Sequence, residues 1–122
     1  MPVTPLTRIA HAVLGVGLLW FAMSAFGPGT PLFWVGLVLP DVALFGGGAG
    51  GALNPAWVSL YNALHTWWTP ALLGLVALVL PVLVPFALGW ACHVAWDRML
   101  GYGLRTPEGL QRHHATPRPA AL

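Results

Sequence analysis

Four side chains of the kinds that ligate divalent metals lie in an otherwise apolar chain. Asp41 follows Pro40, His65 ends the segment YNALH, and His93 and Asp97 belong to the segment HVAWDR. Two imidazole nitrogens and two carboxylate oxygens form a ligand set that suits zinc, manganese or iron. We therefore expect Asp41, His65, His93 and Asp97 to hold one divalent metal ion.

The spacing within these segments places the polar side chains on shared helical faces. His93 and Asp97 are four residues apart, as are Tyr61 and His65, and Asn62 lies three residues before His65. Side chains three or four residues apart are neighbours on an α-helix. Two helices therefore each present a polar stripe, and a carboxylate on a third helix can meet them.

Such a site would support hydrolysis, because a bound divalent cation activates water as a nucleophile near neutral pH. Tyr61 and Asn62 are expected to position a substrate or to orient a ligand. Arg98 has the fork geometry that suits a phosphate or a carboxylate. Tyr102 lies in the Gly-Tyr-Gly hinge of residues 101–103, which would let the tail close over the opening. The sequence assigns no residue a catalytic role.

Each of these residues also has a plain structural interpretation. Asp41 could satisfy the backbone of a broken helix or pair with an arginine. His65 and Asn62 could simply form hydrogen bonds between helices. Asp97 and Arg98 could be the charged collar at the end of a membrane helix. The metal hypothesis depends on all four ligands lying at a similar depth.

Composition indicates an integral membrane protein. The chain has 122 residues, 57% of them hydrophobic and 7% charged, whereas a soluble domain is about 25% charged. Asp41 is the only formally charged residue between Arg8 and Asp97. Such a stretch cannot form a soluble surface. It can cross a bilayer several times, since one helical crossing needs roughly 20 apolar residues.

Glycine and proline divide the chain into about four helices. We expect these over residues 9–26, 31–46 and 55–80, and from the turn at 81–85 to about 99. Pro70 would kink or break the third helix. The expected fold class is therefore all-α, a single domain of residues 1–122 with about four transmembrane helices and a polar cytoplasmic tail over 100–122.

Four crossings place both termini on one side of the membrane. All five arginines then face that side, which the positive-inside rule makes cytoplasmic, so we expect a multi-pass protein of the cell inner membrane. At about 1.5 Å of rise per helical residue, the candidate ligands fall in the cytoplasmic half of the bilayer. Nucleic acid is not an expected partner, because no basic face with interleaved aromatic residues is present.

The order of these segments resembles a known family. The series PD (40–41), YNALH (61–65) and HVAWDRMLGYGLR (93–105), followed by a tail ending in His, resembles the bacterial family known as domain of unknown function 4260 over about residues 8–115. The resemblance implies a small multi-pass membrane protein without an established activity. It also carries His114 over as a tail residue of the site. The family's Arg and Glu at the start of the first helix are only partly matched, because Arg8 is followed by Ile9, Ala10 and His11.

The pattern is similar, more distantly, to membrane-bound metal-dependent hydrolases with PD, His and H-x-x-x-D motifs. That likeness rests on Asp41, His65 and the pair His93 and Asp97. It implies hydrolysis of a lipid or another amphiphile at the cytoplasmic interface. Because folds and motifs are shared between functions, the likeness does not by itself assign an activity.

A non-enzymatic function also stays open. The chain could be a non-enzymatic accessory or scaffold subunit that packs against another membrane protein or a second copy of itself. Its first helix offers small residues for close packing, namely Gly15, Gly17, Ala22 and Ala25. Haem ligation by His65 and His93 is disfavoured, because a compact four-helix chain offers little room for the macrocycle.

Overall fold

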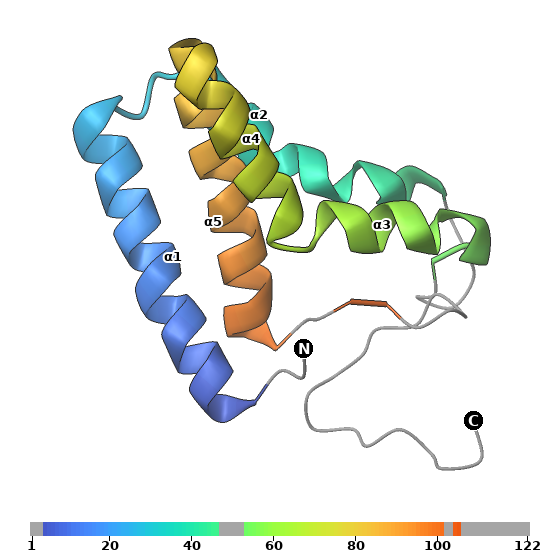
Figure 1. Ribbon diagram of the computed structural model, residues 1–122. Helices are drawn as coiled ribbons and strands as arrows, with labels where there is room; N and C mark the ends of the chain where they lie inside the picture. The colour runs from blue at the N-terminus through green and yellow to red at the C-terminus, as the bar shows by residue number, and fades with distance from the viewer. Residues whose placement is uncertain (1–3, 47–52, 102–103, 106–122) are drawn as a thin grey trace.

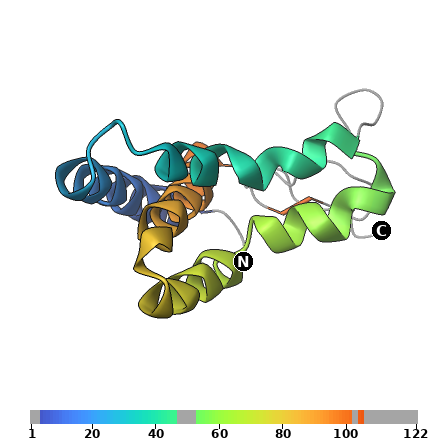
Figure 2. The same cartoon turned by 90° about the horizontal axis from the view of Figure 1, so that it is seen from above.

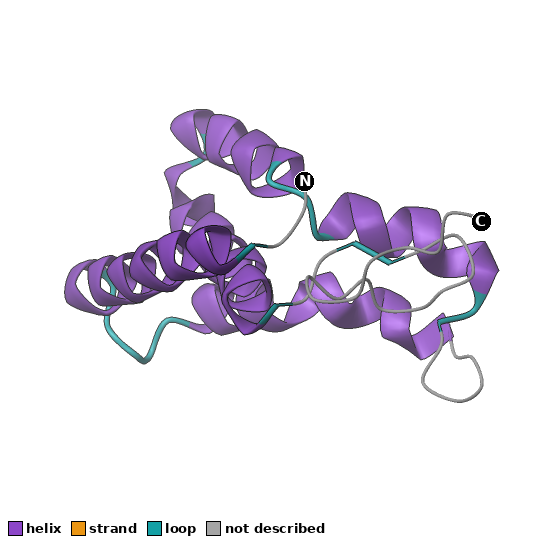
Figure 3. Cartoon of the chain, turned by 90° about the horizontal axis from the view of Figure 1, so that it is seen from below, coloured by secondary structure: helices purple, strands orange, loops and turns teal. Residues whose placement is uncertain are grey.

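The computed structural model describes residues 4–46, 53–101 and 104–105, and all the elements in these ranges are helical (Figure 3). The α-helices are α1 (Pro5–Ala25), α2 (Pro31–Val38), α3 (Val58–Leu64), α4 (Trp68–Val79) and α5 (Val84–Leu100). Three 3₁₀ segments, η1 (Leu39–Gly46), η2 (Pro55–Trp57) and η3 (Pro81–Leu83), connect or extend them. The expected all-α class is confirmed. Most of the expected tail lies outside the described residues.

Helix α5 is the centre of the fold (Figures 1 and 2). Helices α1, α2 and α4 all pack against it. The segment η1 and helix α3 lie beside each other and form an arm directed away from the α1–α5 pair. Helix α5 ends at Gly101, which adopts a left-handed conformation with φ 95°. Glycine takes this conformation without steric cost, so it is the usual residue for ending a helix in this way.

Two glycines bring the backbones of α2 and α5 into contact. A Cβ atom on Gly36 would collide with the carbonyl oxygen of Phe86, and one on Gly89 would collide with the carbonyl oxygen of Phe33. Only glycine therefore permits this crossing. The close approach sets the carbonyl of Leu37, one residue beyond Gly36, beside the next turn of α5.

Side chains from α1, α2 and α5 form the main apolar core. Ala22, Phe33 and Cys92 are buried together, with Trp96 packed against them. Gly15 lies where a Cβ would come within 2.5 Å of the Trp96 ring, so α1 also approaches α5 closely. This core fixes α5, and the polar face of α5 is thereby directed toward η1 and α3.

Helix α1 begins earlier than expected, at Pro5 instead of residue 9. The hydroxyl oxygen of Thr4 accepts a hydrogen bond from the backbone N–H of Thr7 at 3.1 Å, which caps the helix. Pro5 occupies the first helical position, where its missing N–H has no partner to lose. These capping residues extend the helix in front of the apolar run.

Among the described residues, α1 alone is long and apolar enough to cross a bilayer. The apolar stretches Pro31–Val42 and Trp68–Val79 are shorter helices. Large apolar side chains nevertheless cover the outward faces of α1 and α4, including Leu6, Val13, Trp20, Leu75 and Leu78. The four-crossing arrangement stays a prediction.

The expected third helix is broken, and the break lies at residues 65–67 instead of Pro70. Pro70 is the third residue of α4, in the first turn, where a missing N–H costs no helical hydrogen bond. At the break, the hydroxyls of Thr66 and Thr69 both donate to the carbonyl of Ala63, at 3.1 and 2.6 Å. Side-chain hydrogen bonds thus replace the helical ladder where α3 ends.

Candidate metal centre

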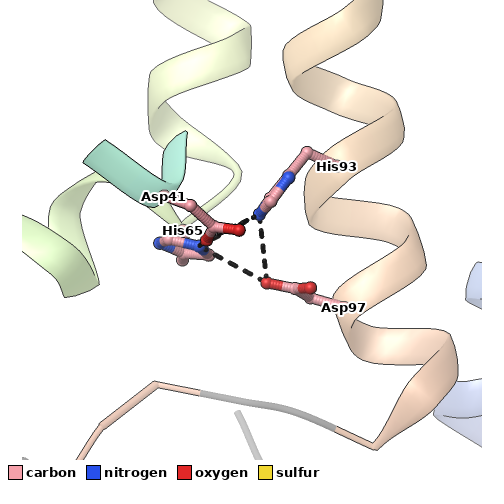
Figure 4. Close-up of side chains that lie close together, drawn as sticks. All are labelled: Asp41, His65, His93 and Asp97. Carbon is pink, nitrogen blue, oxygen red and sulfur yellow. Dashed lines mark hydrogen bonds and ion pairs between the residues drawn. The ribbon is translucent and has the colours of Figure 1, made fainter. Parts of the chain in front are cut away.

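The four expected ligands meet at one place, where three segments of the chain converge (Figure 4). Asp41 comes from η1, His65 follows the last residue of α3, and His93 and Asp97 come from α5. One potential ligand atom from each residue lies within 4.8 Å of all the others. Residues up to 56 positions apart in the sequence therefore form one polar cluster.

The contacts between the ligand atoms are short. Nε2 of His65 lies 3.0 Å from Oδ1 of Asp41 and 3.4 Å from Oδ2 of Asp97. Nε2 of His93 lies 3.2 and 3.3 Å from the same two oxygens. The two Nε2 atoms are 3.1 Å apart. Each imidazole thus faces both carboxylates and the other imidazole.

A second set of contacts fixes which nitrogen of each imidazole faces the cluster. Nδ1 of His65 lies 2.8 Å from the carbonyl oxygen of Tyr61, and Nδ1 of His93 lies 2.7 Å from that of Leu37. A carbonyl oxygen only accepts hydrogen bonds, so Nδ1 must carry a proton in both rings. In the neutral rings each Nε2 therefore presents a lone pair to the cluster.

Protons satisfy this arrangement only in part. With both rings neutral, four acceptor atoms face one another and no donor lies among them. One proton on Nε2 of His93 would supply a single donor, and the Nε2 lone pair of His65 would still lie 3.0 Å from Oδ1 of Asp41. If both Nε2 atoms were protonated, two N–H groups would face each other across 3.1 Å. A single cation would be attracted to all four atoms at once. Metal-binding histidines also commonly donate their other N–H to a backbone carbonyl, as His65 and His93 do here.

The dimensions of the cluster suit a metal ion as well. Ligand atoms about 2.1 Å from a cation lie about 3.0 Å apart at a right angle and about 3.4 Å apart at the tetrahedral angle. Five of the six separations run from 3.0 to 3.4 Å, and the sixth, between the carboxylate oxygens of Asp41 and Asp97, is within 4.8 Å. The cluster can therefore hold a metal ion.

Pro40 explains why the Leu37 carbonyl is available to His93. The chain tightens from α2 into a 3₁₀ helix at Leu39, and a 3₁₀ turn pairs the carbonyl of one residue with the N–H three residues later. For Leu37 that residue is Pro40, which has no N–H. The buried Pro40 thus leaves an acceptor for His93 and places Asp41 directly after it.

Helix α5 holds the end of α3 with two side chains. Nε1 of Trp90 donates to the carbonyl of Leu64 at 2.9 Å, and Nη2 of Arg98 donates to the carbonyl of His65 at 3.0 Å. Carbonyls in the last turn of a helix have no partner within it. Helix α5 therefore supplies two of the ligands and also fixes the position of a third.

Two further residues expected around the centre make structural contacts beside it. The ring of Tyr61 stacks on that of His65, with centroids 3.9 Å apart and planes 16° apart. Arg98 is buried and directed to the backbone at the α3–α4 break. Tyr102 and His114 lie outside the described residues.

Arg105 belongs to the surroundings of the centre. It is the last residue of the segment HVAWDRMLGYGLR, but no role in the site was predicted for it from the sequence. Its guanidinium carbon lies 4.9 Å from the centre of the Tyr61 ring. Its backbone N–H donates to Oδ1 of Asn62 at 2.7 Å, and its carbonyl accepts from Nδ2 of the same side chain at 3.1 Å. The two residues are 43 positions apart, so no helical spacing relates them.

The cluster is open on one side. The side chain of His65 is 2% exposed, whereas that of Asp41 is 42% exposed. Access to the ligand atoms is therefore from the side of η1. Beside Asp41, the apolar side chains of Val38, Leu39 and Val42 are exposed as well.

Two other features lie apart from the centre. Nε2 of His11 accepts a hydrogen bond from Nε1 of Trp67 at 3.1 Å, and His11 does not belong to the cluster. An apolar groove of about 260 Å³ lies between α4 and α5. Its lining residues on α5 include Leu88 and Ala91. His93 follows Ala91 by two residues and so lies on the opposite side of the helix.

The geometry also tests whether His65 and His93 could be the two axial ligands of a haem. Two axial histidines of a haem lie on opposite faces of the macrocycle. The Nε2 atoms of His65 and His93 are 3.1 Å apart, with a carboxylate oxygen of Asp41 and one of Asp97 beside both. This leaves no room for a macrocycle between them.

Comparison with known proteins gives one match. No curated protein and no solved structure matches the chain. The model of the family described as "Domain of unknown function (DUF4260)" matches residues 6–116, which contain all four ligands of the cluster. The chain belongs to this family of unknown function.

Proposed function

We propose that this protein is a membrane-embedded, metal-dependent hydrolase that acts on a lipid or another amphiphile. Asp41, His65, His93 and Asp97 would hold one divalent cation. The observation that carries the proposal is the orientation of the two imidazoles. Both Nδ1 atoms are committed to backbone carbonyls, so both Nε2 lone pairs converge with two carboxylate oxygens on one point.

The cation would supply the polarisation of a substrate oxygen and the activation of water. The four side chains would hold it and fix its open positions. Four protein ligands complete a tetrahedral zinc site, whereas manganese and iron accept further ligands. Catalysis therefore favours an ion with five or six positions, and the exposed side of Asp41 is where water and substrate would reach it.

A membrane location is supported by the surface of the fold and by the direction of its helices. Large apolar side chains cover the outward faces of α1 and α4. Nε of Arg8, near the start of α1, donates to the carbonyl of Met99, near the end of α5, at 2.9 Å. These helix ends lie together (Figure 1), as expected for termini on one side of the membrane. The positive-inside rule would make that side the cytoplasm.

An amphiphilic substrate is supported by the rim of the opening. Val38, Leu39 and Val42, which are near Asp41 in the sequence, have exposed side chains, and the carboxylate of Asp41 is itself half-exposed. An apolar rim beside a charged centre suits a molecule with a polar head and an apolar chain. Exposed apolar surface of this kind commonly marks a site of ligand or membrane contact.

Elemental analysis of the full chain, purified in detergent, tests the proposal. We expect about one divalent metal ion per chain, lost in a His93→Ala variant because one of the four ligands is removed. His11→Ala is the matched control, since His11 lies outside the cluster, and it should keep the metal. A folded His93→Ala protein with its full metal content would contradict the ligand assignment.

A scaffold function is the second candidate, and one observation favours it. Gly17 and Ala25 face outward on α1, and no atom lies within 4 Å of a Cβ built on Gly17. Small outward residues allow close approach of another helix. Gly15 and Ala22 do not contribute, because they are buried against the core. A scaffold would bind no metal, and replacing Asp41 would unfold the protein instead of removing a bound metal ion.

A further inference from the structure

We infer that Arg105 is a positioning residue of the metal centre and acts on His65 through the ring of Tyr61. This inference rests on the proposed metal site and adds a residue that is not itself a ligand. The three side chains form one stack, with the guanidinium of Arg105 over Tyr61 and the ring of Tyr61 over His65. All three residues are less than 9% exposed.

The stack restrains the His65 ring in the one direction that its hydrogen bond does not. The bond from Nδ1 to the Tyr61 carbonyl, 2.8 Å long, acts in the plane of the ring. The Tyr61 ring, 3.9 Å away and nearly parallel, blocks rotation out of that plane. Tyr61 therefore sets both the tautomer and the plane of this ligand. His93 has the first kind of restraint, from the Leu37 carbonyl.

Arg105 completes the restraint because the chain holds it in place. Asn62 binds both backbone polar groups of Arg105, at 2.7 and 3.1 Å. Asn62 and Tyr61 are adjacent residues of α3. Asn62 therefore binds the backbone of Arg105, while the ring of Tyr61 stacks against its side chain. A cation over an aromatic face is attracted more strongly where water is excluded. Arg105 thereby holds Tyr61 against His65.

A double-mutant cycle tests this chain of contacts, with cobalt as a spectroscopic probe. We would measure cobalt affinity and the visible absorption of bound cobalt for the wild type, Arg105→Ala, Tyr61→Leu and the double variant. Changes to residues that orient ligands cost about 10- to 100-fold in metal affinity. We expect each single variant to lose about tenfold and to shift the cobalt spectrum in the same direction.

The double variant decides whether Arg105 acts through Tyr61. Residues that act through one contact are not additive, so the double variant should be no weaker than Tyr61→Leu alone. Arg8→Ala is the matched control, because Arg8 bonds the carbonyl of Met99 and not the cluster, and it should leave the spectrum unchanged. If Arg105→Ala does not fold, Arg105→Lys replaces it, with a smaller loss in the same direction.

The outcomes separate this inference from the function on which it rests. A wild type that binds no cobalt overturns the metal site itself. A wild type that binds cobalt, with an Arg105 variant of unchanged affinity and spectrum, overturns only the positioning role. Losses that add in the double variant overturn the path through Tyr61.

Discussion

At the scale of single residues, the hydrogen bonds of the two imidazoles determine which of their nitrogen atoms face the cluster. In both His65 and His93, Nδ1 is hydrogen-bonded to a backbone carbonyl, and Nε2 lies beside two carboxylates. Helical spacing predicted that His93 and Asp97 share a face. The estimated depth brought the other two candidate ligands to the same level, and the four side chains do lie together. Spacing and depth could not predict the Leu37 carbonyl or Arg105, because those contacts depend on how distant segments pack.

Replacing Asp41 by Asn separates a metal site from a structural ion-pair cluster. In the metal-free protein four acceptors converge, so Asp41→Asn removes a negative charge from a crowded site and should leave the melting temperature unchanged or raise it. The variant should lose the stabilisation by metal, which for the wild type is about 2.7 kcal/mol at a metal concentration 100 times Kd. Thermal unfolding with and without metal measures both effects.

The opposite result has a clear meaning. If the histidines are protonated and paired with the carboxylates, Asp41→Asn breaks two ion pairs and lowers the melting temperature without metal. Asp41 suits this test better than Asp97, because Asp97 precedes the buried Arg98 and also balances its charge.

At the scale of elements, two residues of the cluster, Asp41 and His65, lie just after the end of an α-helix. The break at residues 65–67 places His65 at the end of α3, and the change to a 3₁₀ helix at Leu39 places Asp41. The sequence predicted a kink or a break in the third helix and assigned it to Pro70. Proline is tolerated in a first turn, so its presence did not locate the break. The side chains that cap α3, Trp90 and Arg98, come from a distant helix.

Restoring an N–H at residue 40 should weaken the centre without unfolding the protein. In Pro40→Ala the new backbone N–H can donate to the Leu37 carbonyl, and it then competes with Nδ1 of His93 for that oxygen. We expect metal affinity to fall by about tenfold, as for other changes to a ligand's hydrogen-bond partner, with the helical content retained. Titration with metal and circular dichroism measure the two quantities. Pro70→Ala is the control, since Pro70 lies in a first turn, and equal losses in both variants would contradict this role of Pro40.

The crossing of α2 and α5 can be tested with two glycines. Gly89→Ala drives a Cβ into the carbonyl of Phe33, so it should destabilise the protein by several kcal/mol, as backbone strain and overpacking do. In Gly74→Ala the added Cβ has no atom within 4 Å, and alanine favours a helix more than glycine does. This variant should therefore be more stable by about 0.5–1 kcal/mol. Denaturant unfolding measures both, and a stable Gly89→Ala protein would mean that the two helices do not cross in contact.

At the scale of the whole molecule, composition predicts several membrane crossings, of which the described helices support one by length and apolarity. Apolarity extends over most of the chain, but an uninterrupted helix of spanning length occurs once in the described residues, as α1. Composition reports that a segment avoids water, whereas a single helical crossing needs about 20 residues, and a broken helix crosses only where its free backbone groups are buried in protein or line a cavity. The breaks that shorten the other segments are the same ones that form the centre. The arm of η1 and α3 is directed away from the α1–α5 pair and need not itself span the bilayer (Figure 1).

Labelling from either side of the membrane tests whether α1 crosses. Thr4→Cys places a thiol at the start of α1, and Gly29→Cys places one in the turn between α1 and α2, where no atom lies within 4 Å of a Cβ. The single native cysteine, Cys92, is fully buried and should not react. We expect a membrane-impermeant maleimide to label Gly29→Cys in spheroplasts and Thr4→Cys in inverted vesicles, because the positive-inside rule places Arg8 in the cytoplasm. Labelling of both positions from the same side would show that α1 lies along the membrane surface, and the centre would then open to that side alone.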